Sequence, residues 1–510
     1  MGLDLTRLAL ALGRRRLTGS SSSSSSTTTG VVVGSTASGE PVRFEAPSLE
    51  HAGHLTVFGS SGCGKTSLIA GFLAAEIAED NALPPEQRRS FLVCDPKGDT
   101  VALLLAAMAA QPARLDDVRW LDSFSAGGFP FNLNHLALGD TPRDLRALAL
   151  ADLVGQVSTS TGKSPMGGSG HRQRDVLQHV ILGALSVPHP RASLLLALDA
   201  LELPDGPQRL AAATTSSRAR QFCLSTRLGE ELRVSCASRL RVALSATDSL
   251  SRLISAPTCV QFDELLAPGR ITLVNLGNPP GGMLALQGFY ANLVVRLASE
   301  HLLSRRSPWP GSSTSVVLDE AQVTAETLGD IMERAYTVGR SKGISFVTLT
   351  QSPVLIQAAS DTLLRVLLTN SAAGKLIGRL SAPDAELLAR ERAPGKGVAE
   401  SASLVRSRLV STITSLEDRE FIFLKAGQHQ RFTAAPLDIP GWERALAENA
   451  DRVKAVEERL CLPKDLPPRF SLTEVVLPKK TRGHGGRQAA APPSGSPPSS
   501  TSKPPRSRWG

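Results

Sequence analysis

The chain has 510 residues, a formal net charge of +9 and six cysteines. This length exceeds what one ordinary hydrophobic core organises, so we expect two or more domains or one domain with a large insertion. The cysteines form no C-x-x-C pair, and no apolar run approaches the roughly 18 residues of a membrane-spanning helix. These features argue against a zinc-ribbon protein and against a transmembrane segment of its own. We expect a cytoplasmic protein, with a peripheral place at the inner face of the membrane left open.

The positive charge lies at the two ends of the chain. Residues 477–510 hold seven Lys or Arg and no acid, and residues 1–16 hold four Arg and one Asp, so the body between them is close to neutral. A Ser/Thr tract fills 20–29, and the C-terminal tail is rich in Pro, Ser and Gly. Such segments bury too little apolar surface to offset their ordering entropy. We therefore expect an N-terminal segment, 1–45, with a disordered tract, and a C-terminal helix and disordered basic tail in 446–510.

The most specific motif is GSSGCGKT at 59–66, which fits the phosphate-loop pattern G-x-x-x-x-G-K-[ST]. A short apolar run, 54–58, precedes it as a predicted strand, and apolar residues at helical spacing follow in 67–78. In this setting phosphates meet a helix N-terminus, where backbone N–H groups and the helix dipole favour anions. The predicted nucleotide-binding residues are Gly59, Ser60, Ser61, Gly62, Cys63, Gly64, Lys65, Thr66 and Ser67.

Further along the chain, short β-rich runs alternate with helical patterns. The predicted strands are 91–95, 271–276, 315–319 and 345–350. Apolar strands interleaved with helices are typical of a mostly parallel sheet covered on both faces, the α/β class.

Between 141 and 258 the pattern is helix after helix. We interpret this part as an all-α insertion between two parts of one P-loop motor domain, 46–140 and 259–445. A separate helical domain in series is the less economical alternative.

An acidic pair follows the predicted strand 315–319. Asp319 is a candidate for holding Mg²⁺, and Glu320 is a candidate for polarising the water that attacks a bound nucleotide. The plain alternative is a strand that ends in a solvated acidic turn. Arg340 and Gln351 flank the strand 345–350, and both are candidates to face a nucleotide, although Arg340 fits an ordinary loop arginine equally well.

The ordered motifs resemble the TraG/TraD coupling proteins of conjugation and type IV secretion, within the FtsK/HerA group of hexameric DNA-pumping ATPases. The resemblance extends from about Leu55 to Gly427. It rests on GSSGCGKT, LVCDPKGD (92–99), WLDSFSAGGFPFNLNHL (120–136), VVLDEAQ (316–322) and GRSKGISFVTLTQS (339–352).

The resemblance implies a RecA-like P-loop NTPase fold, ATP and Mg²⁺ as cofactors, and movement of DNA through the pore of a homo-hexamer. The implied roles are phosphate and metal binding by Lys65 and Thr66, an acidic pair of Asp319 and Glu320, a trans-acting Arg340, a γ-phosphate sensor at Gln351, and a family signature at Asp95 and Lys97.

Two departures separate the chain from this family. Members commonly begin with transmembrane helices, which the sequence lacks, and a family proline is replaced in FNLN at 131–134. The chain would then work with a membrane partner protein at a secretion channel, or act on DNA away from any channel. The alternative function is a nucleotide-dependent adaptor that recruits relaxase or effector proteins without processive DNA pumping.

Overall fold

The computed structural model describes residues 30–44, 53–122, 142–156, 170–188, 191–226, 228–245, 261–277, 284–305, 312–392, 399–425, 428–461 and 470–477. Met1–Val475 forms one compact unit and Val476–Gly510 a second. The Ser/Thr tract, the motif part 123–136 with its FNLN, and the basic tail from 478 lie outside the described residues. Within the described ranges, no helix combines the length and apolar character needed to cross a bilayer.

The core of the first unit is an 11-stranded sheet in the order β2-β1-β11-β10-β9-β3-β8-β7-β4-β6-β5. The strands are β1 (Val31–Ser35), β2 (Pro41–Phe44), β3 (Leu55–Phe58), β4 (Ser90–Asp95), β5 (Val118–Asp122), β6 (Ile271–Asn275), β7 (Thr314–Leu318), β8 (Ile344–Thr350), β9 (Gly374–Ile377), β10 (Glu420–Lys425) and β11 (Gln428–Ala434). From β9 to β5 all neighbours pair in parallel. The predicted α/β class with a mostly parallel sheet is confirmed.

The other end of the sheet is antiparallel. Strand β10 pairs with β9 and with β11, and the N-terminal hairpin β1–β2 adds itself to β11. The sequence pattern predicts no strand in 31–44, 374–377 or 428–434, so this extension is a finding of the structure. The polar run QHQRFTA of β11 lacks the apolar pattern that marks a buried strand.

Helices follow the strands along the chain. They are α2 (Lys65–Asp80), α3 (Asp99–Ala109), α4 (Pro112–Leu115), α5 (Arg143–Gln156), α6 (Gly170–Leu185), α7 (Leu195–Glu202), α8 (Gly206–Ala213), α9 (Ser217–Ser225), α10 (Glu230–Ser245), α12 (Phe262–Leu265), α13 (Leu284–Ser304), α14 (Ala325–Val338), α15 (Pro353–Ala359), α16 (Asp361–Thr369), α17 (Ala382–Arg392), α18 (Ala399–Thr414), α19 (Ile439–Glu448) and α20 (Ala450–Glu458).

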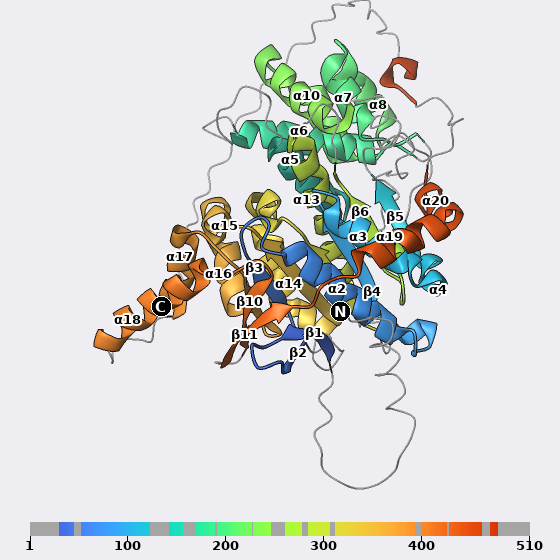
Figure 1. Ribbon diagram of the computed structural model, residues 1–510. Helices are drawn as coiled ribbons and strands as arrows, with labels where there is room; N and C mark the ends of the chain where they lie inside the picture. The colour runs from blue at the N-terminus through green and yellow to red at the C-terminus, as the bar shows by residue number, and fades with distance from the viewer. Residues whose placement is uncertain are drawn as a thin grey trace, which may run out of the picture. The chain divides into compact units, whose positions relative to one another are not determined.

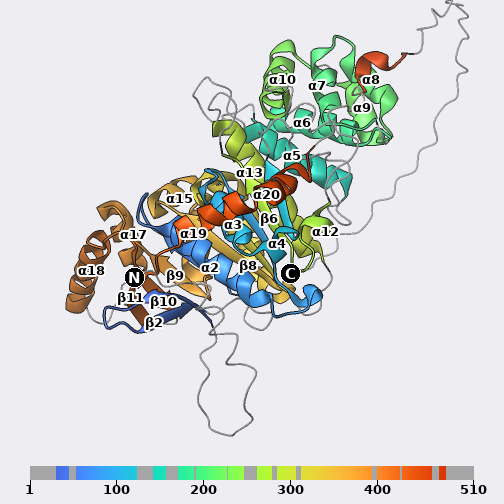
Figure 2. The same cartoon turned by 45° about the vertical axis from the view of Figure 1, so that its right-hand side comes forward.

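Helices cover both faces of the sheet. Helices α2, α3 and α19 lie on one face and α13, α14 and α16 on the other (Figures 1 and 2). The buried side chains of the two groups belong to two separate apolar clusters. Alternate residues of a strand serve the two faces: in β4, Phe91 and Val93 join the first cluster and Leu92 and Cys94 the second. This arrangement explains why the parallel strands read as continuous apolar runs.

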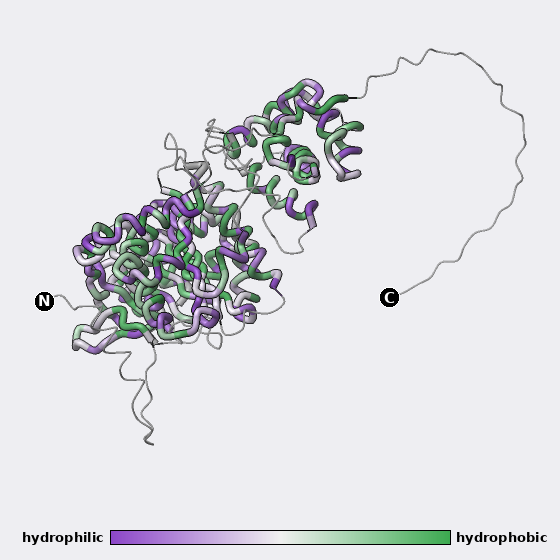
Figure 3. The backbone as a smooth tube through the Cα atoms, turned by 90° about the vertical axis from the view of Figure 1, so that its right-hand side faces the viewer, coloured by the Kyte–Doolittle hydropathy of each residue, from purple (hydrophilic) through white to green (hydrophobic). Residues whose placement is uncertain are grey.

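The described residues between 142 and 245 contain helices α5 to α10 and no strand. Apolar and polar stretches alternate along these helices, as expected for helices that pack on one another (Figure 3). Their buried side chains continue into the cluster that holds α13, and α5 and α10 contact that helix. The boundaries of a separate insertion domain stay a prediction.

Candidate nucleotide site at the carboxyl edge of the sheet

The phosphate loop links β3 to α2, in the order that the sequence predicts. Gly62 and Gly64 have φ angles of 81° and 94°, a conformation that favours glycine. Helix α2 begins at Lys65 with Gly64 as its N-cap and no side-chain cap, so its first N–H groups face the loop. Lys65 is buried, and its Nζ donates to the carbonyl oxygens of Gly59 at 2.6 Å and Ser60 at 3.0 Å. The loop has the form of an anion cradle.

Small residues let this loop lie against the strand next to it. A Cβ on Gly59 would fall 2.6 Å from Cys63 Sγ, and one on Gly378, after β9, would fall 3.0 Å from the same atom. Burial raises the pKa of the Cys63 thiol, which is fully enclosed. Cys63 therefore fills space inside the loop and is no reactive thiol. Among the other predicted loop residues, Ser61 and Gly62 are exposed, whereas Ser60, Thr66 and Ser67 are half-buried.

The carboxyl ends of four neighbouring parallel strands gather the predicted polar residues. Phe58 of β3 pairs with Thr350 of β8, Leu318 of β7 pairs with Thr348 of β8, and β7 in turn pairs with β4. The residues that follow these ends are the phosphate loop, Gln351 and the Asp319–Glu320 pair, and β4 itself ends on Asp95. Strands β3 and β7 are two strand spacings apart, about 10 Å. Asp319 thus lies on the same sheet edge as Thr66.

Asp95 and Asp319 are buried carboxylates on adjacent strands. Asp319 Oδ2 accepts from Thr100 Oγ1 at 2.6 Å and Oδ1 accepts from the Glu320 N–H at 2.8 Å, so its partners are a hydroxyl and an amide, not a cation. Burial, followed by the negative charge of Asp95, raises the pKa of Asp319 to about 6. A cation bound between the end of β7 and the phosphate loop would stabilise the ionised forms of these two neighbouring buried carboxylates.

The Glu320 carboxylate accepts hydrogen bonds from three side chains. Its Oε1 accepts from Lys97 Nζ and, at 2.6 Å, from Gln351 Nε2, and its Oε2 accepts from Gln322 Nε2. Burial alone would raise the pKa of Glu320, but the hydrogen bonds from Lys97 and Gln351 lower it below the ordinary value. The φ angle of Glu320 is 51°, an uncommon backbone conformation for a residue other than glycine.

Arg340 lies at the opposite edge. It is exposed in the turn Gly339–Lys342, which precedes β8, whereas Gln351 follows the end of the same strand. The seven residues of β8 span about 20 Å. Within one chain the two side chains therefore lie at opposite edges of the sheet, and the role of Arg340 as a trans-acting arginine stays a prediction.

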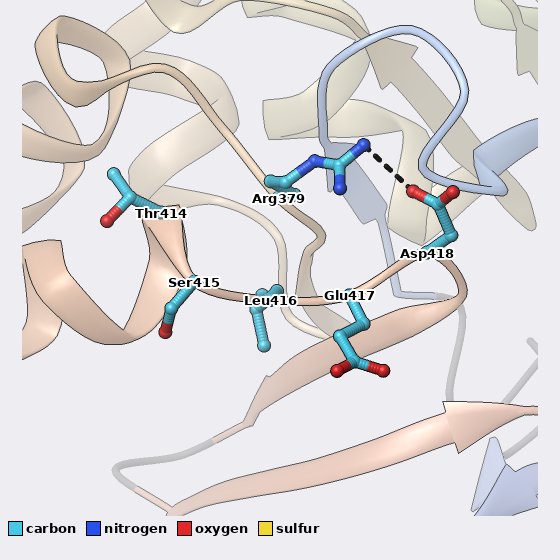
Figure 4. A pocket seen from close by; sticks show the side chains of 6 residues that line it. All are labelled: Arg379, Thr414, Ser415, Leu416, Glu417 and Asp418. Atoms are coloured by element: carbon cyan, nitrogen blue, oxygen red, sulfur yellow. Dashed lines mark ion pairs between the residues drawn. The ribbon is translucent and has the colours of Figure 1, made fainter.

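The structure adds residues that sequence reasoning missed. Thr100 donates a hydrogen bond to Asp319, and Gln322 donates one to Glu320. A cavity of about 530 Å³, open to solvent, lies beside the phosphate loop. The cavity is lined by Arg379 and by residues 414–418, and Figure 4 shows the Arg379 guanidinium directed at the Asp418 carboxylate, 2.8 Å away. The Ser60 N–H donates to the Arg379 carbonyl at 2.7 Å. No short motif marks this cavity, because its walls come from segments 35 residues apart on either side of the hairpin α17–α18.

These residues fit a nucleotide and Mg²⁺. The loop glycines leave room that a Cβ would fill, and Lys65 and the α2 amides supply donors for phosphate. In the described part of the chain, no group of three or more His, Cys, Asp or Glu could hold a metal on its own. A magnesium ion here would take few protein ligands, Thr66 and Asp319, and complete its shell with phosphate and water oxygens, as this ion does in phosphate loops.

No protein-family model matches the chain, and no curated protein matches it significantly. Solved structures do share its fold. VirB4 of Thermoanaerobacter pseudethanolicus has a TM-score of 0.53 at 16% sequence identity, over 81% of this chain and 98% of that chain.

The plasmid coupling protein TrwB gives a similar likeness. In complex with the non-hydrolysable ATP analogue ADPNP it has a TM-score of 0.50 at 15% identity, over 84% of this chain and 92% of that chain. In complex with the GTP analogue GDPNP the values are 0.50 and 16%, over 81% and 91%. At such identity the likeness establishes the fold, and it agrees with the resemblance to coupling proteins that the motifs carry.

Proposed function

We propose that this chain is an ATPase of the conjugation and type IV secretion group, which couples ATP hydrolysis to movement of DNA or a nucleoprotein. One observation carries the proposal: Lys65, the adjacent Asp319 and Glu320, and Gln351, from three separate stretches of sequence, gather at one edge of the sheet. That set provides a phosphate ligand, a metal ligand, a carboxylate that activates the attacking water and a polar sensor of the γ-phosphate. These are the parts needed for phosphoryl transfer to water.

Each residue has a role that follows from its position. Lys65 leaves its two loop carbonyls to contact the β and γ phosphates, and the α2 amides hold the phosphate oxygens. Thr66 and Asp319 would hold Mg²⁺, which offsets the phosphate charge when bound. Glu320 orients the attacking water and accepts its proton, while Gln351 contacts the γ-phosphate. The cavity beside Arg379 offers space for the ribose and base.

The placement of Arg340 supports a ring. A cation for the γ-phosphate that lies a full strand length from its own site must be supplied to a neighbouring copy. A closed homo-oligomer in which every amino edge meets the next carboxyl edge satisfies all sites at once, and we propose a hexamer. DNA would pass through the pore of that ring.

A second function, an adaptor that binds nucleotide and recruits relaxase or effector proteins, is favoured by one observation. The body of the chain is nearly neutral, whereas a channel that follows phosphates normally carries Lys and Arg. In that case the helices α5–α10 and the basic tail would hold the protein partner, and a membrane partner protein would place the assembly.

The test is the steady-state ATPase rate of the full chain with and without single- and double-stranded DNA, beside Glu320→Gln and a mass measurement under nucleotide. The translocase predicts DNA-stimulated turnover, loss of it in Glu320→Gln, and a hexamer mass. Unstimulated or absent turnover with intact nucleotide binding would favour the adaptor.

A further inference from the structure

The ion pair between Lys97 and Glu320 is unequal. The Glu320 side chain is 6% exposed and the Lys97 side chain is 46% exposed. The two residues are 223 positions apart and come from the ends of neighbouring strands, β4 and β7. An anion arriving from solvent therefore meets the lysine and not the acid.

The loop that carries Lys97 is fixed while its side chain is not. Asp95 Oδ1 accepts from the Lys97 N–H at 2.8 Å, and Asp95 Oδ2 accepts from the Thr100 N–H at 2.6 Å. Gly98, with a φ of 89°, completes the tight turn into α3. The ammonium group can accordingly change partner by rotation of its four-carbon stem, without movement of the backbone.

The carboxylate of Glu320 is held in one orientation by three donors. Gln322, one of them, is itself oriented because its Oε1 accepts from Thr350 Oγ1 at 3.0 Å. With Lys97 and Gln351 on Oε1 and Gln322 on Oε2, three of the four acceptor positions of the carboxylate are filled. Turning the carboxylate away from this orientation, toward an attacking water, breaks at least one of these hydrogen bonds, and Lys97 is the donor that solvent reaches.

We propose that Lys97 is a positioning residue that restrains Glu320 and releases it when its ammonium group binds a phosphate of the nucleic-acid backbone. The inference rests on the proposed function and names what couples DNA to hydrolysis. A Lys–phosphate contact is a charge-assisted bond of the same class as the Lys–carboxylate contact, so the exchange is close to balanced. Binding of a nucleic-acid phosphate to Lys97 would thereby free Glu320, the carboxylate that activates water.

The first experiment measures ATP turnover of Lys97→Met in the full chain. We expect turnover without DNA to rise about fivefold, the effect of removing one half-exposed ion pair, with an unchanged KM for ATP. DNA should no longer stimulate turnover of Lys97→Met. The separate variant Lys97→Arg, which keeps the positive charge, should be stimulated by DNA as the wild type is. Lys454→Met is the matched control, since Lys454 forms a Lys–Glu pair with Glu458 on the surface of α20 and should behave as wild type. A fall in turnover, or stimulation as in wild type, would overturn the proposal.

The second experiment does not depend on hydrolysis. Binding of a fluorescein-labelled oligothymidylate is measured by anisotropy for wild type, Lys97→Met, Glu320→Gln and the double variant. Glu320→Gln should bind about fivefold more tightly because it frees Lys97, while Lys97→Met and the double variant should bind equally and more weakly than wild type. No coupling between the two sites would overturn the proposal even if ATP turnover is DNA-stimulated. Coupling without turnover would instead uphold it and count against the ATPase.

Discussion

The two edges of the parallel sheet differ in what they carry. The carboxyl edge holds the phosphate loop and the buried cluster of Asp95, Asp319 and Glu320, closed by Gln351. The amino edge holds Arg340, exposed in its turn, beside a neutral, buried His54. One edge is enclosed and organised by hydrogen bonds; the other presents a cation to solvent.

The proposed ring would use this difference as a division of labour between copies. In that proposal the carboxyl edge binds the nucleotide, and the exposed Arg340 of the amino edge supplies one further positive charge to the site of the next copy. Each chain would then contribute residues to two sites. Four changes test this division, from the largest expected effect to the smallest.

Lys65→Ala removes the main phosphate contact of the carboxyl edge. We expect ATP turnover to fall below detection, by more than about a thousandfold, because Lys65 is the buried cation that faces the loop among the residues that the structure describes. A phosphate-release assay measures it, and circular dichroism checks that the fold is intact. Retained turnover would break the assignment of this edge as the nucleotide site.

Arg340→Ala should lower turnover about a thousandfold, as for arginines that act in trans, while nucleotide binding is kept. Mixing it with Lys65→Ala sharpens the comparison. In mixed rings, some interfaces join an intact Lys65 from one copy to an intact Arg340 from the next, so part of the activity should return. A mixture as inactive as its components would show that the two edges do not meet.

Gln351→Ala removes one of three donors to Glu320 and the predicted sensor. We expect a roughly tenfold lower rate in the presence of DNA, since one hydrogen bond to a charged group is lost. Without DNA we expect little change, because Lys97 and Gln322 still hold Glu320. The ratio of the two rates is the measurement. Unchanged stimulation would show that Gln351 takes no part in coupling DNA binding to ATP turnover.

The smallest effect concerns His54 at the amino edge. Its Nδ1 accepts from the Phe346 N–H at 3.1 Å and its Nε2 lies 3.1 Å from the Tyr336 carbonyl, a pattern for the neutral ring. Burial lowers the pKa of His54 to about 4, against 6.5 in the unfolded chain, so the unfolded state gains the proton first as the pH falls. The contribution of the neutral His54 ring to the free energy of unfolding is therefore complete above pH 6.5 and is lost progressively as the pH falls toward 4.

Between pH 7 and 5.5, His54 should lower the free energy of unfolding by about 1 kcal/mol. Urea unfolding at both pH values measures this, and His54→Gln should reduce the difference while lowering stability at pH 7. An equal pH dependence in the variant would mean that the ring is not held neutral.

The sequence predicted those elements whose residue pattern lies within one continuous segment of the chain. The phosphate loop, with its strand and helix, and strands β4, β6, β7 and β8 were predicted because a continuous apolar run or a fixed spacing marks them. The antiparallel extension was not, since β11 is polar and β9 has only four residues.

Contacts between distant segments were equally hidden from the sequence. Lys97 stands in a turn motif that gives no sign of its bond to Glu320, and Arg340 and Gln351 look like neighbours although a whole strand separates them. Such facts follow from strand order, which no local pattern encodes.

The hairpin β1–β2 has a consequence for biosynthesis. Ser35 pairs with Thr433, so the ribosome makes about 400 residues between these two partners. At 5–20 residues per second this takes roughly 20–80 s, during which VVVGS has no strand beside it on that side. The nascent chain thus exposes one edge of an apolar β segment until β11 emerges, and an unpaired strand edge of this kind is prone to wrong pairing and aggregation.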